Sequence, residues 1–269
     1  MTDSLAPALR VLTQNIRMAD PDAVPGSADY WPDRAGVLAD ELGVVDADVI
    51  GTQEVLFEQI PVLDAALGAT HDRLGYGREG GGRGEHNLLH VRRDRFEVLD
   101  WDQFWLSEEP QLIGSIGWGA HCPRICVWAR VHDTASDTDL ILAVTHLDHA
   151  DDEARRHGAQ LLAQRLDADA GDLPIVLMGD FNAAAGESLP WQTLTAAGFA
   201  DAHDDADRIV GPDLGTFPDY REPVPGDERI DWILTRGMTV ECYEALAHRR
   251  DGVWASDHTG VLADLRVRR

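Results

Sequence analysis

The sequence predicts an α/β fold, and three observations support this prediction. Strand-like apolar runs outnumber the runs with helical spacing, and the two kinds are interspersed along the chain. Several strand-like runs are joined by short turns, such as residues 92–95. The chain has 269 residues, 44% of them hydrophobic, which is enough for one large core. Because no Pro/Ser-rich linker or block of charge separates the runs, we expect one domain over residues 1–269.

The expected strands are short apolar runs bounded by turn-forming residues. They lie near residues 9–15, 48–53, 86–91, 96–106, 125–132, 139–146, 174–179, 229–235, 238–247 and 259–267. The expected helices lie near 33–43, 57–68, 151–169 and 188–197. The third begins with three acidic residues, 151–153, which suit the positive end of a helix dipole, and its Leu162 and Leu166 recur at helical spacing. The Gly-rich segment 76–84 predicts a loop.

Composition restricts the partners and the compartment. The net charge is −25, and all 23 basic residues are Arg. Such acidity repels polyanions at long range and argues against a non-specific nuclease; the same composition also marks a high-GC or salt-adapted genome. No apolar run of 18 residues occurs, so no stable membrane association is expected. Three cysteines without an export signal predict reduced thiols and a cytoplasmic protein.

Five short polar motifs occur at the ends of strand-like runs. Four follow an apolar run and the fifth precedes one. Strand ends in a layered α/β protein collect at one edge of the sheets, so we expect these groups to meet in space. Carboxylates, amides and histidines at one rim are what a hard divalent cation and a phosphate ester require. The motifs are Gln14-Asn15, Gln53-Glu54, Thr145-His146-Leu147, Gly179-Asp180-Phe181-Asn182 and Ser256-Asp257-His258.

This ordered set resembles the endonuclease/exonuclease/phosphatase superfamily, whose DNase I-like fold is shared by deoxyribonucleases, abasic-site endonucleases, sphingomyelinases, inositol polyphosphate phosphatases and deadenylases. The resemblance runs from about Leu9 to Leu265. Residues 104–108, 117–124 and 145–149 look like a bacterial, deadenylase-like branch. The resemblance implies a four-layer α/β/β/α sandwich of two mixed β-sheets flanked by helices, whereas the internal pattern alone indicates only the α/β class.

The resemblance also implies a metal site. Glu54 ends an apolar strand, and Mg²⁺ prefers one or two carboxylates together with waters and substrate oxygens. Asn15 carries no charge but can orient a water or a neighbouring carboxylate. In the family the matching Asn and Glu form the principal metal site, and Asp257 looks like a further ligand of the metal or of its water. We therefore expect Mg²⁺ or Mn²⁺ as the cofactor.

Two further constellations suit the activation of water. Asp180 and Asn182 are two residues apart, so they share one side of the chain while Phe181 turns away to pack. By resemblance, Asp180 positions or deprotonates the attacking water and Asn182 supports the phosphate. Asp231 is expected to bond His258, which would fix the imidazole tautomer and raise its basicity.

The remaining candidates lie on the substrate side. His146 ends a strand, and the resemblance implies that it binds a phosphate oxygen or acts as an acid, with Glu85 as its carboxylate partner. Arg124 is expected to clamp the phosphate, the alternative being a surface salt bridge. His149, Trp118, His121 and Trp254 are candidates for the rim of the site, the favoured alternative for each being packing in the core or in a loop.

These features predict a Mg²⁺- or Mn²⁺-dependent phosphoesterase in which water attacks in line. The substrate is a phosphodiester or phosphomonoester, either a small molecule or a short nucleic acid, and no obligate protein partner is evident. The acidic surface favours a small phosphoester; the family labels favour a nuclease acting on DNA or RNA. An inactive binding scaffold is a third alternative, against which the complete motif set argues. The number of metal ions stays open.

Overall fold

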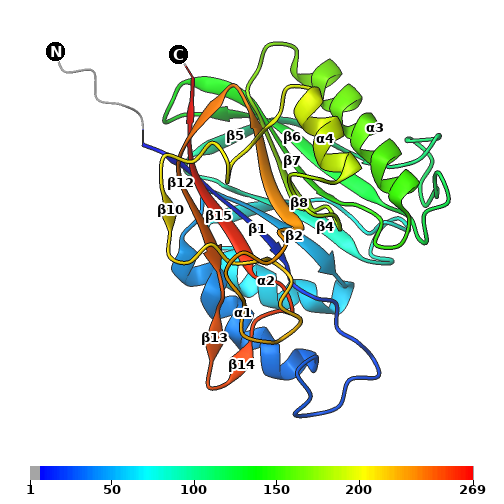
Figure 1. The fold of residues 1–269 in the computed structure, drawn as a ribbon, viewed down its shortest axis with the longest axis vertical. Coiled ribbons are helices and arrows are strands. Elements are labelled where there is room, and N and C mark those ends of the chain that lie inside the picture. The colour runs from blue at the N-terminus through cyan, green and yellow to red at the C-terminus, as the bar shows by residue number, and fades with distance from the viewer. Residues whose placement is uncertain (1–6, 269) are drawn as a thin grey trace.

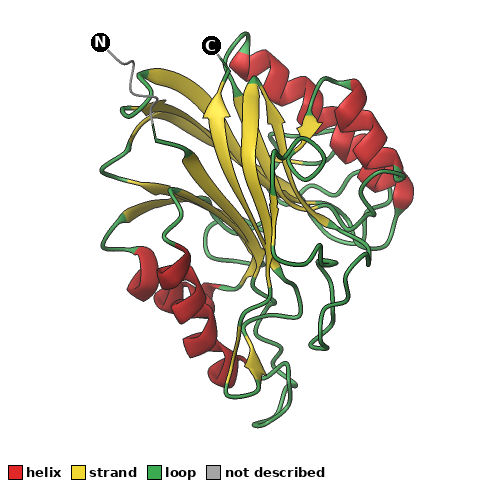
Figure 2. Ribbon diagram, turned by 60° about the vertical axis from the view of Figure 1, so that its left-hand side comes forward, coloured by secondary structure: helices red, strands yellow, loops and turns green. Residues whose placement is uncertain are grey.

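Two mixed β-sheets pack face to face, and helices cover both outer sides (Figures 1 and 2). This computed structural model describes residues 7–268. Figure 2 shows the strands as the two middle layers, with one group of helices on each side. The four-layer α/β/β/α sandwich implied by the motifs is therefore confirmed.

The seven-stranded sheet carries the N-terminal and C-terminal strands at its centre. Strand β1 pairs parallel with β2 and antiparallel with β15, so the sheet is mixed. Its outer face is covered by α1 (Trp31–Val45), the short 3-10 helix η1 (Phe57–Gln59) and α2 (Ile60–Leu67). In spatial order its strands are β10 (Ile209–Val210), β12 (Met238–Leu246), β15 (Gly260–Val267), β1 (Leu9–Asn15), β2 (Val49–Val55), β4 (His86–Arg92) and β3 (His71–Leu74).

The six-stranded sheet forms the other middle layer. Strands β7 and β8 are parallel, and the crossover between them is α3 (Asp152–Ala170), which packs beside α4 (Leu189–Ala196) on the outer face. In spatial order its strands are β5 (Phe96–Trp105), β6 (Ile125–Asp133), β7 (Thr138–His146), β8 (Ile175–Asp180), β11 (Asp231–Arg236) and β9 (Ala200–Asp201). A separate two-stranded hairpin, β13 (Arg249–Arg250) with β14 (Val253–Trp254), lies near α1.

Three apolar cores hold the layers together. The first lies between the sheets, the second between α3, α4 and the six-stranded sheet, and the third between α1, α2 and the seven-stranded sheet. Each fully buried aliphatic side chain contributes roughly 1.5–3 kcal/mol relative to an exposed one. Within residues 7–268, no helix is both long and apolar enough to cross a membrane.

The predicted elements occur close to their predicted bounds. Each of the ten expected strands is present, with ends within two residues of the prediction. The expected helix near 57–68 divides into η1 and α2, because Pro61 suits the first turn of a new helix. The short strands β3, β9, β10, β13 and β14 were not predicted, since two- to four-residue strands are set by their neighbours and not by local pattern. Segment 76–84 contains no helix or strand, as predicted.

A buried carboxyl group, Glu41 on α1, lies beneath the seven-stranded sheet. Its side chain is almost inaccessible, and its Oε1 has no hydrogen-bond partner among the described residues. The Oε1 of Gln14 also lacks a partner, and both oxygens lie within 3.4 Å of the point that a Cβ on Gly260 would take. Burial raises the pKa of Glu41 to about 8. The Glu41 carboxyl group therefore carries its proton at neutral pH.

Glu41 makes stability depend on pH in a predictable direction. Because the folded state holds this proton more tightly than the unfolded state, stability is greatest below the unfolded pKa of 4.5 and is lost as pH rises through about 8. We expect Glu41→Gln to raise the free energy of unfolding by about 2–4 kcal/mol at pH 8.5 and by little at pH 5. Urea unfolding at both pH values measures this. The exposed Glu58→Gln is the control, and an equal effect of Glu41→Gln at both pH values would contradict the assignment.

Candidate active site

The end of β8 places Asp180 at the centre of the edge where the motifs meet. Its neighbour Gly179 has φ 152°, and a Cβ there would lie 2.0 Å from the carbonyl oxygen of Thr145, so only glycine fits. On the other side, Phe181 turns into the core and stacks on Trp232 with ring centroids 4.2 Å apart. The backbone before Asp180 and the ring after it thus fix the direction of this carboxylate.

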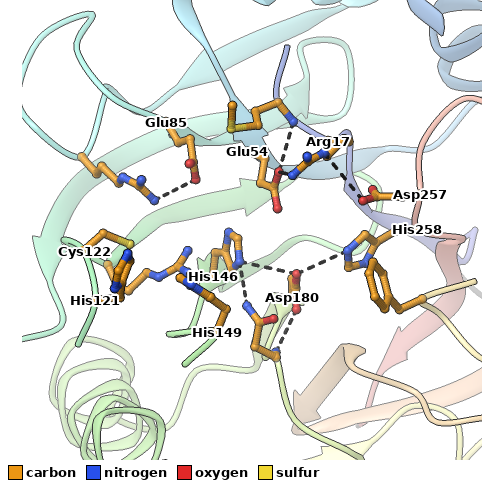
Figure 3. Close-up of a pocket in the computed structure, with 15 residues that line it drawn as sticks. Arg17, Glu54, Glu85, His121, Cys122, His146, His149, Asp180, Asp257 and His258 are labelled. Atoms are coloured by element: carbon orange, nitrogen blue, oxygen red, sulfur yellow. Dashed lines mark hydrogen bonds and ion pairs between the residues drawn. The ribbon is translucent and has the colours of Figure 1, made fainter. Parts of the chain in front are cut away.

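Four side chains or backbone groups converge on the Asp180 carboxylate. Figure 3 shows His146 and His258 facing it from two sides. Its Oδ2 accepts a hydrogen bond from Asn15 Nδ2 at 3.0 Å and lies 3.5 Å from His146 Nε2 and 3.8 Å from His258 Nε2. Its Oδ1 accepts from the backbone N–H of Asn182 at 2.8 Å. Burial, together with the nearby charge of Asp231, raises the pKa of Asp180, and the His258 charge opposes this rise.

Glu54 reaches the site through an irregularity in β2. The register with β4 shifts between Thr52 and Val55, and Glu54 has the left-handed φ of 62°. Such a bulge re-aims a side chain that regular pleating would point elsewhere. Its oxygens accept from Asn15 Nδ2 at 2.9 Å and from the backbone N–H of Met18 at 3.1 Å. Burial would raise the pKa of Glu54, but these bonds and the charges of His258 and Arg17 hold it below its ordinary value.

Asn15 joins the two carboxylates. One amide nitrogen donates to both Glu54 and Asp180, while its Oδ1 accepts from the backbone N–H of Arg17 at 2.9 Å. The amide oxygen is thus directed at the backbone and the nitrogen at the carboxylates. Asn15 therefore lies in the expected metal region, where its geometry suits holding Glu54 and Asp180 in place.

His258 and Asp231 are hydrogen-bonded, as the motif suggests. His258 Nδ1 lies 2.9 Å from Asp231 Oδ2, and both side chains are buried. Burial would lower the pKa of His258, but the charge and hydrogen bond of Asp231, with the charges of Asp180 and Asp257, raise it well above its ordinary value. The Nε2 atom of the imidazole is left to face Asp180. Phe217 packs on the ring, with centroids 4.8 Å apart.

His146 and Asn182 form a second polar pair. The Nδ2 group of Asn182 lies 2.8 Å from His146 Nε2 and donates to the Leu147 carbonyl at 3.1 Å. Burial, with the charges of Arg124 and Arg78, lowers the pKa of His146 far below its ordinary value. The imidazole is therefore neutral at physiological pH, which suits a hydrogen-bonding role.

The far end of the pocket contains two arginines with partners. Arg78 pairs with Glu85 at 2.8 Å, so the carboxylate expected beside His146 is bonded to a guanidinium instead. Arg124 is buried; its Nη2 lies 2.9 Å from His149 Nδ1, and its Nε has no hydrogen-bond partner among the described residues. Burial raises the pKa of Glu85.

One pocket of about 370 Å³ collects most of the predicted residues. Two more, Asn15 and Asp231, lie behind its wall and bond residues that line it. The sequence also suggested His121 and His149, which line the rim, but did not single out Arg17, Met18, Cys122 or Phe217 as site residues. Arg17 follows Asn15 by two residues, and this proximity was the one available signal. The predicted residues lining the pocket are Glu54, Glu85, Arg124, His146, Asp180, Asn182, Asp257 and His258.

The pocket contains three donor atoms that could hold a metal ion together. Glu54, His146 and Asp180 each offer an atom within 4.8 Å of the others. Two carboxylates and one imidazole, beside a pocket open to water and substrate, form a donor set that could hold a divalent metal ion. Asp257 approaches from the other side, and the Arg17 guanidinium lies between it and Glu54 (Figure 3).

A family model described as the endonuclease/exonuclease/phosphatase family matches residues 12–258. The chain belongs to this family. An endonuclease/exonuclease/phosphatase from Bacteroides vulgatus is 35% identical, with 97% of this chain and 99% of that one covered and a TM-score of 0.89. None of the curated proteins matches the chain.

Two other solved structures show the breadth of the endonuclease/exonuclease/phosphatase family. The mannosyl-6-phosphatase of Bacteroides thetaiotaomicron is 29% identical, with 96% of this chain and 99% of that one covered and a TM-score of 0.87. TDP2 of D. rerio, complexed with a single-stranded DNA product, is 17% identical, with 97% and 99% covered and a TM-score of 0.71. The second likeness shows the fold alone.

The hydrogen bond between His258 and Asp231 predicts coupled effects on turnover. We expect His258→Ala to lower kcat by roughly 10²–10⁴, the usual range for a general acid or base, and Asp231→Asn to lower it less. The double variant should be little worse than His258→Ala, because the two residues act as one unit. Steady-state kinetics on a phosphoester substrate, with circular dichroism to verify folding, measures these effects.

The chain provides a matched control for this pair. His132 and Asp139 also lie 2.9 Å apart but are partly exposed at the far ends of β6 and β7. His132→Ala and Asp139→Asn should leave kcat within about twofold of the unmodified protein, because surface ion pairs contribute little. Losses that multiply in the His258/Asp231 double variant would show that the two side chains act independently.

Proposed function

We propose that this chain is a divalent-metal-dependent phosphoesterase that hydrolyses a small phosphoester by in-line attack of water. The convergence of Asn15, His146, Asn182 and His258 on the Asp180 carboxylate carries this proposal. Membership of a family that includes a mannosyl-6-phosphatase supports a hydrolase acting on phosphoesters. The nearby Glu54 carboxylate supports metal dependence.

Each residue has a role that follows from its charge and position. A divalent ion held by Glu54, with Asp257 on the far side of Arg17, would polarise the phosphoryl oxygen and offset charge on the leaving oxygen. Asp180, whose pKa is raised by burial, orients the attacking water and takes its proton. His258, held by Asp231, faces Asp180 and acts with it in preparing the water for attack.

The other pocket residues suit the phosphoryl group. Asn182 and neutral His146 offer hydrogen bonds without adding net charge. Arg124 contributes a buried guanidinium that contacts His149 through Nη2 and lies 3.7 Å from Asp148 Oδ2 through Nε, and its positive charge attracts a phosphoryl oxygen.

Charge favours a small substrate. The chain carries a net charge of −25, which repels an extended polyanion. The arginines lining the pocket already have protein partners: Arg17 with Asp29, Arg78 with Glu85 and Arg124 with His149. A grip on several successive phosphates needs several uncommitted cations. A sugar phosphate is the first candidate, because the mannosyl-6-phosphatase relative is similar over nearly its full length.

A nuclease is the second candidate. The structure of TDP2 with a single-stranded DNA product shows that this fold can accept nucleic acid in that protein. At 17% identity the likeness extends to the fold and not to the substrate. The salt dependence of binding separates the two candidates.

The first prediction tests the metal. We expect the unmodified chain to hydrolyse a hexose 6-phosphate with Mg²⁺ or Mn²⁺ and to lose activity with a chelator. Glu54→Gln should lower kcat/KM by at least about 10²-fold, because it removes a charged ligand and not a core residue. Phosphate release measures this, and the exposed Glu97→Gln on β5 is the control. Full activity of Glu54→Gln would exclude Glu54 as a metal ligand.

The second prediction tests substrate size. Contact with one or two phosphates predicts a slope of log affinity against log salt no steeper than about −2, given roughly −0.7 to −0.9 per phosphate. Inhibition of the phosphoesterase by a short oligonucleotide and by a mononucleotide, measured across a salt series, determines the slope. Tight oligonucleotide binding with a slope near −5 would favour the nuclease instead.

A further inference from the structure

Arg17 lies between two carboxylates that come from distant parts of the chain. Its Nη1 is 3.8 Å from Glu54 Oε2, and its Nε is 3.8 Å from Asp257 Oδ2. Figure 3 shows the guanidinium between the two side chains, at the upper wall of the pocket. The residue adopts the left-handed φ of 56°, which a residue with a long side chain adopts rarely. The backbone is therefore strained at the residue whose guanidinium points into the site.

A second layer of residues holds the guanidinium in this position. Asp29 accepts from Arg17 Nη2 at 2.8 Å and from Nε at 3.2 Å. Tyr220 donates its hydroxyl to Asp29 at 2.8 Å. The buried Arg34 lies 3.6 Å from the same carboxylate and donates to the carbonyls of the loop that follows β1. Arg34 anchors that loop, and Asp29 orients the Arg17 guanidinium so that it also lies 3.8 Å from both Glu54 and Asp257.

The charge at this centre is negative when no metal ion is bound. Glu54, Asp180, Asp257 and Asp29 contribute four negative charges, and the guanidiniums of Arg17 and Arg34 contribute two positive ones. Asp231 is left out because it is paired with His258. Two negative charges remain, which one divalent ion would neutralise. A second divalent ion would reverse the sign and leave an excess of positive charge among these side chains.

We propose that Arg17 takes the place of a second metal ion, so that the centre holds one divalent cation at Glu54 while Arg17 neutralises the side facing Asp257. The inference rests on the metal-dependent function proposed above and specifies the composition of its site. Arg17 is a positioning residue: it sets the spacing of Glu54 and Asp257 and limits the negative potential that a metal ion meets.

Metal titration tests this inference without reference to turnover. The metal-stripped full chain is titrated with MnCl₂ in a calorimeter, and we expect one Mn²⁺ per chain. Arg17→Met removes the resident cation, so we expect Mn²⁺ affinity to rise about tenfold, because each carboxylate attracts the ion without competition. Arg17→Lys keeps the charge and should stay within about threefold of the unmodified protein.

The same variants give a second readout through stability. In chelator, Arg17→Met should lower Tm, because Glu54 and Asp257 face each other unneutralised; added Mn²⁺ should recover this loss through linkage. Arg10→Met is the matched control. Arg10 lies on β1, the strand that also carries Asn15, and makes a two-point salt bridge to Asp264 away from the pocket. Added Mn²⁺ should not restore the Tm of Arg10→Met.

The possible outcomes separate this inference from the proposed function. Two Mn²⁺ ions bound to the unmodified chain would overturn the inference, as would an Arg17→Met variant with unchanged or weaker Mn²⁺ binding. If Arg17→Met does not fold, the number of Mn²⁺ ions bound by the unmodified chain still tests the inference. Absence of any Mn²⁺ or Mg²⁺ binding to the unmodified chain would instead overturn the metal-dependent function itself.

Discussion

Two carboxylates, Asp180 and Asp231, lie opposite each other on the neighbouring strands β8 and β11, and the site depends on how their repulsion is offset. His258 lies between them, 2.9 Å from one and 3.8 Å from the other. Burying two like charges away from water costs several kcal/mol unless a counter-charge is present. The two carboxylates therefore need the imidazolium of His258 between them, and His258 needs the carboxylates to keep its charge. The raised pKa of Asp180 follows from the same burial.

The rigid sheets supply the support for this arrangement. Glu54, Arg17 and Asn182 all have left-handed backbone conformations, and each such residue costs about 1–3 kcal/mol. The three cores, one between the sheets and one on each outer face, bury enough apolar surface to tolerate this strain at one edge. The strained residues lie where strands end, because inside a ladder they would break backbone hydrogen bonds on both sides.

The use of arginine as the basic residue bears on both the net charge of the protein and the charge inside its pocket. Every basic residue is Arg, and those at the pocket are held by carboxylates or an imidazole. A planar guanidinium can keep one partner and still offer hydrogen bonds elsewhere, which a lysine ammonium does less well. The pocket therefore has fixed positive charge without an exposed cationic groove, in keeping with the proposed small substrate.

The sequence by itself determined the order of the strands along the chain and which polar residues end them. Local pattern suffices there, because alternation and strand-end polarity are short-range properties: Asp180 and His258 were both found this way. Their distances, the left-handed turn at Glu54, and the pairing of Glu85 with Arg78 were decided only by the tertiary structure. Arg17 shows why: its meaning depends on Asp257, which is 240 residues away in the chain but 3.8 Å away in space, and no local pattern encodes such a contact.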